Sequence, residues 1–328
     1  MKYLLFFSTC LHCLFSYSPL QGAEPYLKNI QQITFPEMGF ERAGEAYFSP
    51  DSKTIIFQAI PKGEKNYQIY TLQLGEKTPL LVSTGKGSCT CAFFRPDGKK
   101  IIFASSHSAP TIPKKKEPLG KYVWDLTPYM NIYEANLDGS DLHPLTTGSA
   151  YHAECAYSQD GTEIVYASNE TGSMNLYIMD ADGSNVRQIT HTDYSYNGGP
   201  FFSPEGSHII FRSDRSKKDF LQIFITDREG VERQLTDNGA VNWAPYWHPN
   251  GDVIAYTTSI HGHHQYELYL MNITTFAECR LTESPSFDGL PVFNREGDLI
   301  LWTSKRGDDS CQIFLATFIM PDALNTTK

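Results

Sequence analysis

The chain has 328 residues, of which 41% are hydrophobic, and a formal net charge of −10 at pH 7. This length and apolar content are sufficient for a sizeable buried core. The acidic balance argues against nucleic acid as a partner, because phosphate binding requires an excess of Lys and Arg.

The first 23 residues differ in composition from the rest. Lys2 precedes an apolar run from Tyr3 to Phe15, and the segment ends in Gln21-Gly22-Ala23. This arrangement predicts a secretory signal peptide at residues 1–23. The run is too short to span a bilayer, so we expect an exported mature chain, residues 24–328, with no transmembrane segment. The mature chain contains five cysteines, an odd number that leaves at least one without a disulfide partner in the same chain.

One short unit occurs six times in the mature chain. It is typified by Phe202-Ser203-Pro204-Glu205-Gly206 followed by Ile209-Ile210-Phe211, and its copies begin near residues 48, 94, 157, 202, 247 and 293. Pro fixes φ, the acid bonds the local backbone and Gly adopts a positive φ, so the unit predicts a tight turn leading into a buried strand. A period in the forties with strand content is typical of a β-propeller whose blades have four strands.

A third and a fourth strand also recur. Asn175-Leu176-Tyr177 typifies the third and Arg187-Gln188-Ile189-Thr190 the fourth, but only five copies of the fourth follow a core unit. The sixth copy, Ile30-Gln31-Gln32-Ile33-Thr34, lies before the first unit. We therefore expect an all-β, six-bladed β-propeller of four-stranded blades, in which this N-terminal strand completes the last blade and closes the ring.

The loops divide between the two faces of such a ring. If the Pro-Asp-Gly turns lie at the bottom face, the innermost strands begin at the top face. The loop at residues 107–130, which makes the interval between the units at 94 and 157 longer than the others, then lies at the top face as well. That loop contains several prolines and Trp124, so we expect it to form an ordered lid or wall of a top-face funnel. Residues three and five positions before the first aromatic of each unit should lie near the channel mouth.

Polar and aromatic residues in these regions are the candidates for ligand or partner binding. They are Glu45, His107, Trp124, His152, Glu154, Asn197, Asn242, Trp243 and Asp288. For Glu45 and Glu154 the alternative is a structural role, in which the carboxylate accepts hydrogen bonds from backbone amides at strand starts. For Asp288 the alternative is a turn residue that precedes the strand.

A metal site is the alternative use of the top-face histidines. His107, His152, His261 and His264 would supply imidazole ligands for Zn, Cu or Ni, with Glu45 or Glu154 as the base. The segment around His261 and His264 favours an exposed polar loop over a metal site, so we expect no cofactor. The sequence contains no Gly-x-Ser-x-Gly, His-Glu-x-x-His or phosphate-binding Gly-rich motif, and we assign no catalytic residue.

The repeated unit resembles the PD40 repeat of TolB-like proteins. The likeness extends over about residues 28–318 and includes the segments Glu45 to Ser49, Asp180 to Ser184, Gly198 to Pro204 and Asn242 to Pro245. The resemblance implies a six-bladed propeller in the periplasm that binds an envelope protein or peptide, such as a peptidoglycan-associated lipoprotein. TolB proper carries an α/β domain before its propeller, so we expect a short exported bacterial form without that domain.

The residues and the resemblance together favour a non-catalytic propeller that binds a protein, peptide or cell-envelope component through its top-face funnel. The alternative is a metal-assisted lyase or hydrolase that acts on a polysaccharide or peptide in the funnel, with a divalent metal ion as cofactor. A third hypothesis is a structural module whose funnel holds only solvent.

Overall fold

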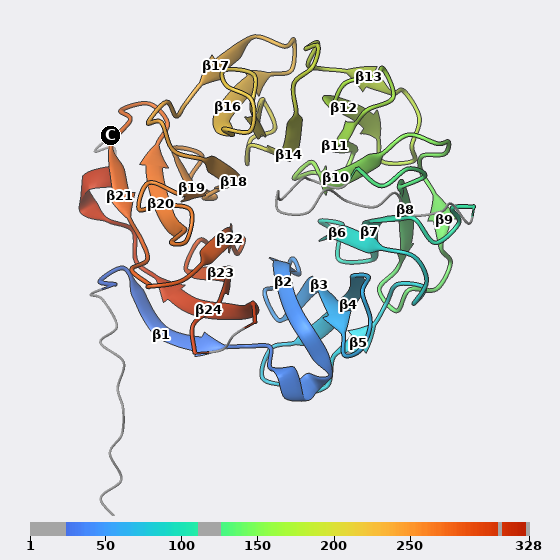
Figure 1. Cartoon of the computed structure of the whole chain (residues 1–328), viewed down its shortest axis with the longest axis horizontal. Helices are drawn as coiled ribbons and strands as arrows, with labels where there is room; N and C mark the ends of the chain where they lie inside the picture. Colours follow the sequence, from blue (N-terminus) through green and yellow to red (C-terminus); the bar gives the residue numbers. More distant parts are fainter. Residues whose placement is uncertain (1–23, 111–125, 308–309, 326–328) are drawn as a thin grey trace, which may run out of the picture.

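The computed structural model describes residues 24–110, 126–307 and 310–325, and it shows six four-stranded antiparallel sheets arranged in a ring (Figure 1). Apart from strands, these residues form two short 3-10 helices, η1 (Pro36–Met38) and η2 (Asp322–Leu324). The expected all-β, six-bladed β-propeller is confirmed. The signal peptide predicted at residues 1–23 and the candidate Trp124 lie outside the described residues.

The four strands of each blade follow one another from the ring axis outward. The innermost strands are β2 (Phe40–Phe48), β6 (Cys89–Phe94), β10 (His152–Tyr157), β14 (Asn197–Phe202), β18 (Asn242–Trp247) and β22 (Asp288–Phe293). The second strands are β3 (Thr54–Pro61), β7 (Lys100–Ser105), β11 (Glu163–Ser168), β15 (His208–Ser213), β19 (Val253–Thr258) and β23 (Leu299–Ser304). The third strands are β4 (Gln68–Gln73), β8 (Asn131–Asn136), β12 (Asn175–Asp180), β16 (Gln222–Asp227), β20 (Glu267–Asn272) and β24 (Gln312–Phe318). The outermost strands are β5 (Leu80–Leu81), β9 (His143–Pro144), β13 (Arg187–Gln188), β17 (Glu232–Gln234), β21 (Glu278–Arg280) and β1 (Leu27–Gln32).

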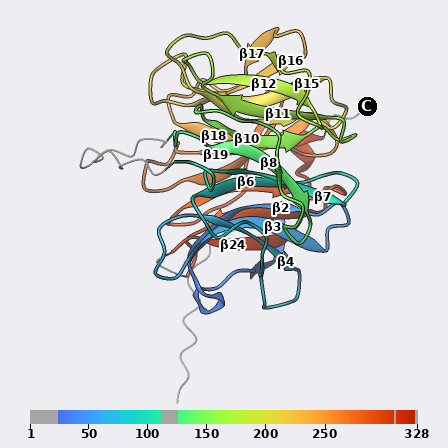
Figure 2. The ribbon, with the colours of Figure 1, turned by 90° about the vertical axis from the view of Figure 1, so that its right-hand side faces the viewer.

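We number the blades 1 to 6 in the order of their innermost strands, so that blade 6 consists of β22, β23, β24 and β1. Seen from the side, the strands run along the ring axis and the loops lie on two opposite faces (Figure 2). The top face is the one at which the innermost strands begin.

The repeated sequence unit forms the first hairpin of every blade. Its first aromatic is the last residue of the innermost strand, as Phe202 is of β14, and the turn glycine Gly206 has a φ of 76°. Ser203 closes this turn, because its amide donates to the His208 carbonyl and its hydroxyl accepts from the His208 amide. The strand that follows is wholly buried at Ile209, Ile210 and Phe211, which explains why its sequence has an apolar run there.

A hydroxyl after the outermost strand fastens it to the third strand in all six blades. In blade 3 the Thr190 hydroxyl accepts the Leu176 amide at 2.9 Å and donates to the Asn175 side-chain oxygen at 3.0 Å. The equivalent hydroxyls belong to Ser83, Thr146, Thr236, Thr282 and Thr34. This contact explains why Ser or Thr recurs at the end of the fourth sequence element and an amide or carboxylate at the start of the third.

The N-terminal strand closes the ring. β1 pairs antiparallel with β24 as the fourth strand of blade 6, with Leu27 opposite Phe318. The strand begins earlier than expected, but the pairing continues beyond β1, because the Ile33 amide donates to the Ile313 carbonyl. Thr34, the hydroxyl of the recurring contact, then accepts the Ile313 amide at 2.9 Å. The first strand of the chain therefore behaves as the missing sixth copy of the outermost strand.

The core lies between adjacent sheets, as a ring of blades requires. The largest fully buried side chains include Trp302, Tyr256 and Phe211, all on second strands. Within the described part of the chain, no helix is long and apolar enough to cross a membrane.

Candidate functional site

A β-bulge in each innermost strand places one residue at the wall of the central channel. The bulged residues are Glu45, Cys91, Glu154, Gly199, Ala244 and Leu290, all with φ between 48° and 59°. The pairing with the second strand shifts register at each of them. All six line one cavity, which we call the top-face pocket. They are the residues three positions before the last aromatic of each innermost strand, where the sequence predicts the channel mouth.

In four of the six blades, the preceding blade supplies an acceptor for the backbone amide of the bulged residue. The Thr303 hydroxyl of blade 6 accepts the Glu45 amide at 3.0 Å. Blade 3 has Ala167 at this position, and there the Glu154 carboxylate accepts the Gly199 amide instead. Equivalent contacts join Gln58 to Cys91 and Thr257 to Leu290. Glu154 therefore performs the amide-binding role considered as its alternative.

Glu154 is also engaged by side chains. Its carboxylate forms an ion pair with Arg212 Nη2 at 2.9 Å and accepts hydrogen bonds from the hydroxyls of Tyr196 at 2.7 Å and Tyr151 at 3.2 Å. Arg212 reaches the pocket from β15, and a Cβ at Gly199 would clash with its guanidinium. The sequence therefore has glycine at the one bulge that faces this ion pair. Glu154 and Arg212 form a buried, charge-neutral unit in the pocket wall.

Glu45 lines the same pocket without such compensation. Its half-buried carboxylate accepts a hydrogen bond from the Tyr47 hydroxyl at 3.4 Å, and it makes no ion pair with any described residue. Burial raises the pKa of Glu45 above its ordinary value; Arg212 opposes this shift and the Glu154 charge reinforces it. A positive charge added beside Glu45 would therefore stabilise its ionised form.

Four aromatic rings meet on the channel axis below the pocket. The Tyr47 ring of blade 1 lies 5.0 Å from Phe93 and 5.8 Å from Phe201 of the opposite blade 4, and Phe201 lies 4.9 Å from Tyr246, measured between ring centroids. A second pocket begins on the far side of these rings, lined by Phe93, Phe201, Tyr246 and the prolines of the bottom turns. The rings therefore form a floor that separates the top-face pocket from the bottom of the channel.

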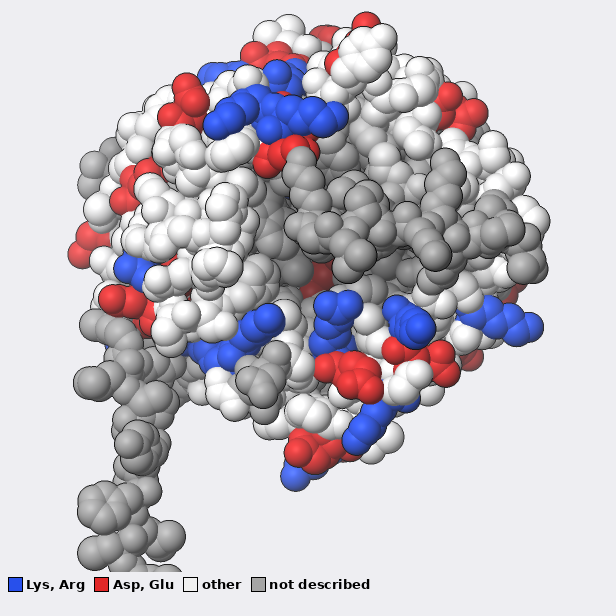
Figure 3. Space-filling view, in the orientation of Figure 1, with Lys and Arg blue, Asp and Glu red and all other residues white. Residues whose placement is uncertain are grey.

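An aromatic surface adjoins the pocket at blades 4 to 6. Trp243, which lines the pocket, has its ring centroid 6.4 Å from Tyr266 and 6.3 Å from Phe287, and His263 lies 6.2 Å from Tyr266 and 6.5 Å from Phe220. We call these five partly or fully exposed residues the aromatic patch. Figure 3 shows a broad area without charged side chains over blade 5, with Lys, Arg, Asp and Glu gathered mainly around the margin.

Two predicted residues, Asn197 and Asn242, face the seam with the preceding blade. Both are wholly buried. The Asn197 side-chain amide donates to the Met174 carbonyl at 2.8 Å, and that of Asn242 donates to Gln222 Oε1 at 2.9 Å. Their polar atoms thus hold neighbouring blades together and do not line the top-face pocket.

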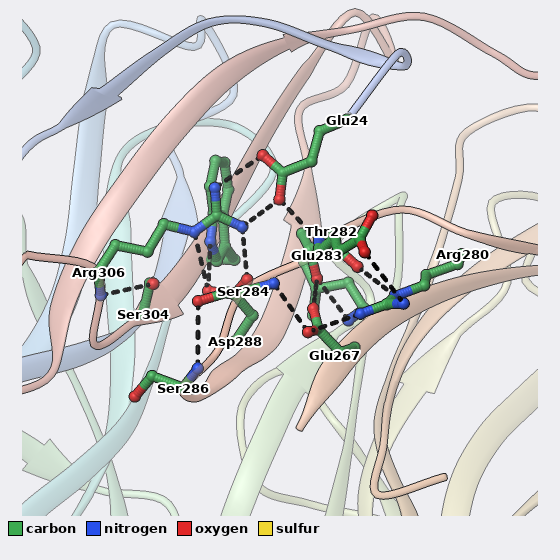
Figure 4. Close-up of polar contacts among 12 residues, drawn as sticks. Glu24, Glu267, Arg280, Thr282, Glu283, Ser284, Ser286, Asp288, Ser304 and Arg306 are labelled. Atoms are coloured by element: carbon green, nitrogen blue, oxygen red, sulfur yellow. Dashed lines mark hydrogen bonds and ion pairs between the residues drawn. The ribbon is translucent and has the colours of Figure 1, made fainter. Parts of the chain in front are cut away.

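Asp288 occupies the equivalent position in blade 6 and belongs to a buried charge cluster (Figure 4). Arg306 donates to Asp288 Oδ2 at 2.5 Å and to the Glu24 carboxylate at 2.7 Å, and the Trp302 indole donates to Asp288 Oδ1 at 3.2 Å. Glu24 also accepts the Glu283 amide at 2.8 Å. The cluster ties the segment before β1 to blade 6 and to the loop after β21.

The histidines considered as metal ligands lie on separate elements. His107 follows β7, His152 lies in β10, and His261 and His264 lie in the exposed loop between β19 and β20. His152 is buried, with Nε2 3.2 Å from a Glu170 carboxylate oxygen, and burial lowers the pKa of its imidazole. Among the residues that the structure describes, no group of three or more His, Cys, Asp or Glu side chains is arranged to hold a metal ion.

Arg212 is absent from the predicted site residues, although the sequence contains a signal for it. It is the tenth residue after the first aromatic of its unit, and the other five units have uncharged residues there, namely Gln58, Ala104, Ala167, Thr257 and Thr303. A single charge in a buried strand position requires a partner, which here is Glu154. The sequence also contains a signal for the aromatic floor. In four units an aromatic residue stands one position before the last aromatic of the innermost strand, namely Tyr47, Phe93, Phe201 and Tyr246.

These blades and the closed channel define the chain as a six-bladed β-propeller. The family model described as the TolB beta propeller domain, PD40, matches residues 124–265. Over these residues, which are less than half of the chain, the protein is similar to TolB-like β-propellers.

Solved structures of TolB and of other propellers are similar to it. TolB from Agrobacterium tumefaciens shares 19% identity with a TM-score of 0.63, over 89% of this chain and 97% of that chain. TolB from Acinetobacter baumannii shares 19% identity with a TM-score of 0.59, over 84% of this chain and 63% of that chain. An oligogalacturonate lyase in complex with manganese shares 16% identity with a TM-score of 0.54, over 90% of this chain and 94% of that chain. At these identities the likeness concerns the fold alone.

Proposed function

We propose that the chain is a non-catalytic β-propeller of the periplasm that binds a protein, peptide or cell-envelope component through its top face. The observation that carries this proposal is the aromatic patch, which is continuous with the top-face pocket through Trp243. Aromatic residues supply large, rigid contact areas and are enriched at the centres of binding surfaces. An occupant that covers the patch reaches the pocket with a single side chain. The resemblance to TolB-like proteins makes an envelope protein, such as a peptidoglycan-associated lipoprotein, the first partner to test.

Capture of partners from an envelope extract tests this proposal. The bait is the chain from residue 24 onward, and the test variants are Trp243→Ser and Tyr266→Ser. We expect each to weaken capture roughly tenfold or more, as truncation of a binding hot spot does. Phe276→Ser is the matched control, because Phe276 is an exposed apolar residue in the turn between β20 and β21, at the opposite end of blade 5. Equal capture by the wild-type protein and both patch variants would remove the top face from the proposal.

The second candidate is a metal-assisted lyase or hydrolase acting on a polysaccharide or peptide. Two observations favour it: the fold likeness to oligogalacturonate lyase, and the raised pKa of Glu45, which suits a general acid or base in an enclosed pocket. Metal analysis of the purified protein, followed by assays on oligogalacturonate and peptide substrates, tests it. A Glu45-dependent activity with stoichiometric metal supports the enzyme, and a metal-free, inactive protein rejects it.

A further inference from the structure

The described residues that line the top-face pocket have an unbalanced set of ionisable groups. Among them, only Glu45, Glu154 and Arg212 have a carboxyl or guanidinium group. Glu154 and Arg212 neutralise each other across 2.9 Å. Ionised Glu45 therefore leaves the pocket with one net negative charge that no described side chain offsets by an ion pair.

The pocket is also divided into a polar and an apolar side. Above the floor residues, all of the charged side chains come from blades 1 to 4, which contribute Glu45, Cys91, Glu154, Cys155, Gly199 and Arg212. Blades 5 and 6 contribute Trp243, Ala244, Pro245, Leu290, Pro291 and Val292. The aromatic floor, which includes Tyr47, Phe201 and Tyr246, limits the depth to which an occupant can enter. A matching occupant has one positive head group on an apolar stem.

The chemistry of the walls distinguishes among cations. Calcium requires six to eight oxygen ligands and magnesium near-ideal octahedral oxygen geometry. Among the described side chains of the pocket, Glu45 has the only carboxylate that is not engaged in an ion pair. A primary ammonium group needs fewer partners, because it has three donors and is attracted by aromatic faces such as those of Trp243 and Tyr47. A lysine stem packs well on apolar surface while its head group stays solvated or paired.

We propose that the top-face pocket binds one primary ammonium group on an apolar stem, namely a lysine side chain that the partner inserts beside Glu45 and along Trp243 and Leu290. This inference rests on the proposed top-face binding function. It adds the chemical class of the anchoring group and assigns Glu45 the role of its counter-ion.

Titration with n-pentylammonium chloride and with 1-pentanol tests the inference without any partner. The two molecules share a stem and differ in the head group. By calorimetry or NMR at neutral pH, we expect the wild-type protein to bind the amine roughly tenfold more tightly than the alcohol, a difference of one favourable charge contact in a shielded site. Glu45→Gln should abolish this preference, whereas Glu64→Gln, an exposed acid in the loop between β3 and β4, should retain it. Equal affinity for both molecules in the wild-type protein, or an unchanged preference in Glu45→Gln, overturns the proposal.

The pH dependence of wild-type binding provides a second measurement that needs no variant. Amine affinity should fall as acid protonates Glu45, while alcohol affinity stays constant. An equal change in the affinities of the two molecules overturns the proposal.

Peptides then identify the source of the ammonium group. We expect a peptide with a blocked N-terminus and one lysine to bind, and its acetyl-lysine form to bind roughly tenfold less tightly or worse. Preference for a free N-terminus without lysine overturns the lysine assignment. Pentylammonium binding involves no partner, so the two experiments give independent results. Failure of the amine to bind would not contradict partner capture through the aromatic patch, and loss of partner capture would not contradict amine binding.

Discussion

Replacement of Arg306 by leucine measures how strongly the buried charge cluster secures the N-terminal segment. Arg306 donates to Glu24 through Nη1 at 2.7 Å and Nη2 at 2.5 Å, and to Asp288 through Nη2 at 2.5 Å and Nε at 3.3 Å. The side chains of Glu24 and Asp288 are only 3% and 0% exposed. Removal of one partner from a buried ion pair costs about 3–5 kcal/mol, because the remaining charge is left without compensation. Leucine would leave two such carboxylates, so we expect the upper part of this range, or roughly a thousandfold in the unfolding equilibrium, by the rule of about 1.4 kcal/mol per tenfold.

Urea unfolding followed by tryptophan fluorescence provides the assay, because the Arg306 guanidinium lies 5.4 Å from the Trp302 ring centroid. Lys305→Leu, an exposed neighbour, is the control and should change the stability by less than about 0.5 kcal/mol. The double variant Glu24→Gln with Arg306→Leu should lose less than the sum of the single variants, because one of the stranded charges is gone. A cost below about 1 kcal/mol for Arg306→Leu, or strict additivity, would refute the reasoning.

Three further predictions concern closure, the bulge and the pocket carboxyl. Deletion of residues 24–36 should lower the unfolding temperature of the entire ring, because it removes the fourth strand of blade 6; unchanged thermal unfolding would contradict this closure. Thr303→Val should cost about 1–3 kcal/mol in urea unfolding, since the Glu45 amide loses its acceptor, and a cost near zero would mean that this amide does not need the hydroxyl. Burial raises the folded-state pKa of Glu45 above its ordinary value of 4.5, so folding favours the protonated carboxyl, and wild-type stability declines as pH rises through the folded-state pKa. Glu45→Gln should therefore be more stable than the wild-type protein at neutral pH and lose this advantage below pH 4.5, and calorimetry that finds the same difference at both pH values would refute it.

The fold could be predicted because the residues that form the strands and turns of a blade recur six times in the sequence. The aromatic before the turn, as at Phe202, ends an innermost strand in every blade, and the hydroxyl that includes Thr34 fastens every outermost strand. A recurring local contact is visible in sequence because the residues that make it keep the same spacing. The position of Thr34 before the first unit was therefore sufficient to predict how the ring closes.

The site was predicted only in part, and the bulge explains why. In a regular strand, residues two apart share one face, so Glu154 and His152 were expected to point alike. The bulge at Glu154 shifts the register, so that Glu154 faces the channel while His152 is buried beside Glu170. Asn197 and Asn242, at the equivalent positions of their strands, face the seams. A positive φ at a glutamate is not readable from one sequence, because non-glycine residues rarely adopt it. The sequence therefore predicted that Glu45 and Glu154 lie at the channel. It could not distinguish them from the residues two positions earlier in the innermost strands, such as His152 and Asn197, which are buried away from the pocket.

The pairing of β1 with β24 also dictates the order in which the molecule can fold. The contact joins the start of the described chain to its end, with Leu27 opposite Phe318. Loop closure over such a distance comes late, because its entropy must be offset by structure already formed between. Until β24 exists, β1 has no partner strand and is an exposed edge that invites pairing with other chains. A ribosome-bound chain can thus form its middle blades, but the ring can close only after β24 has also been synthesised.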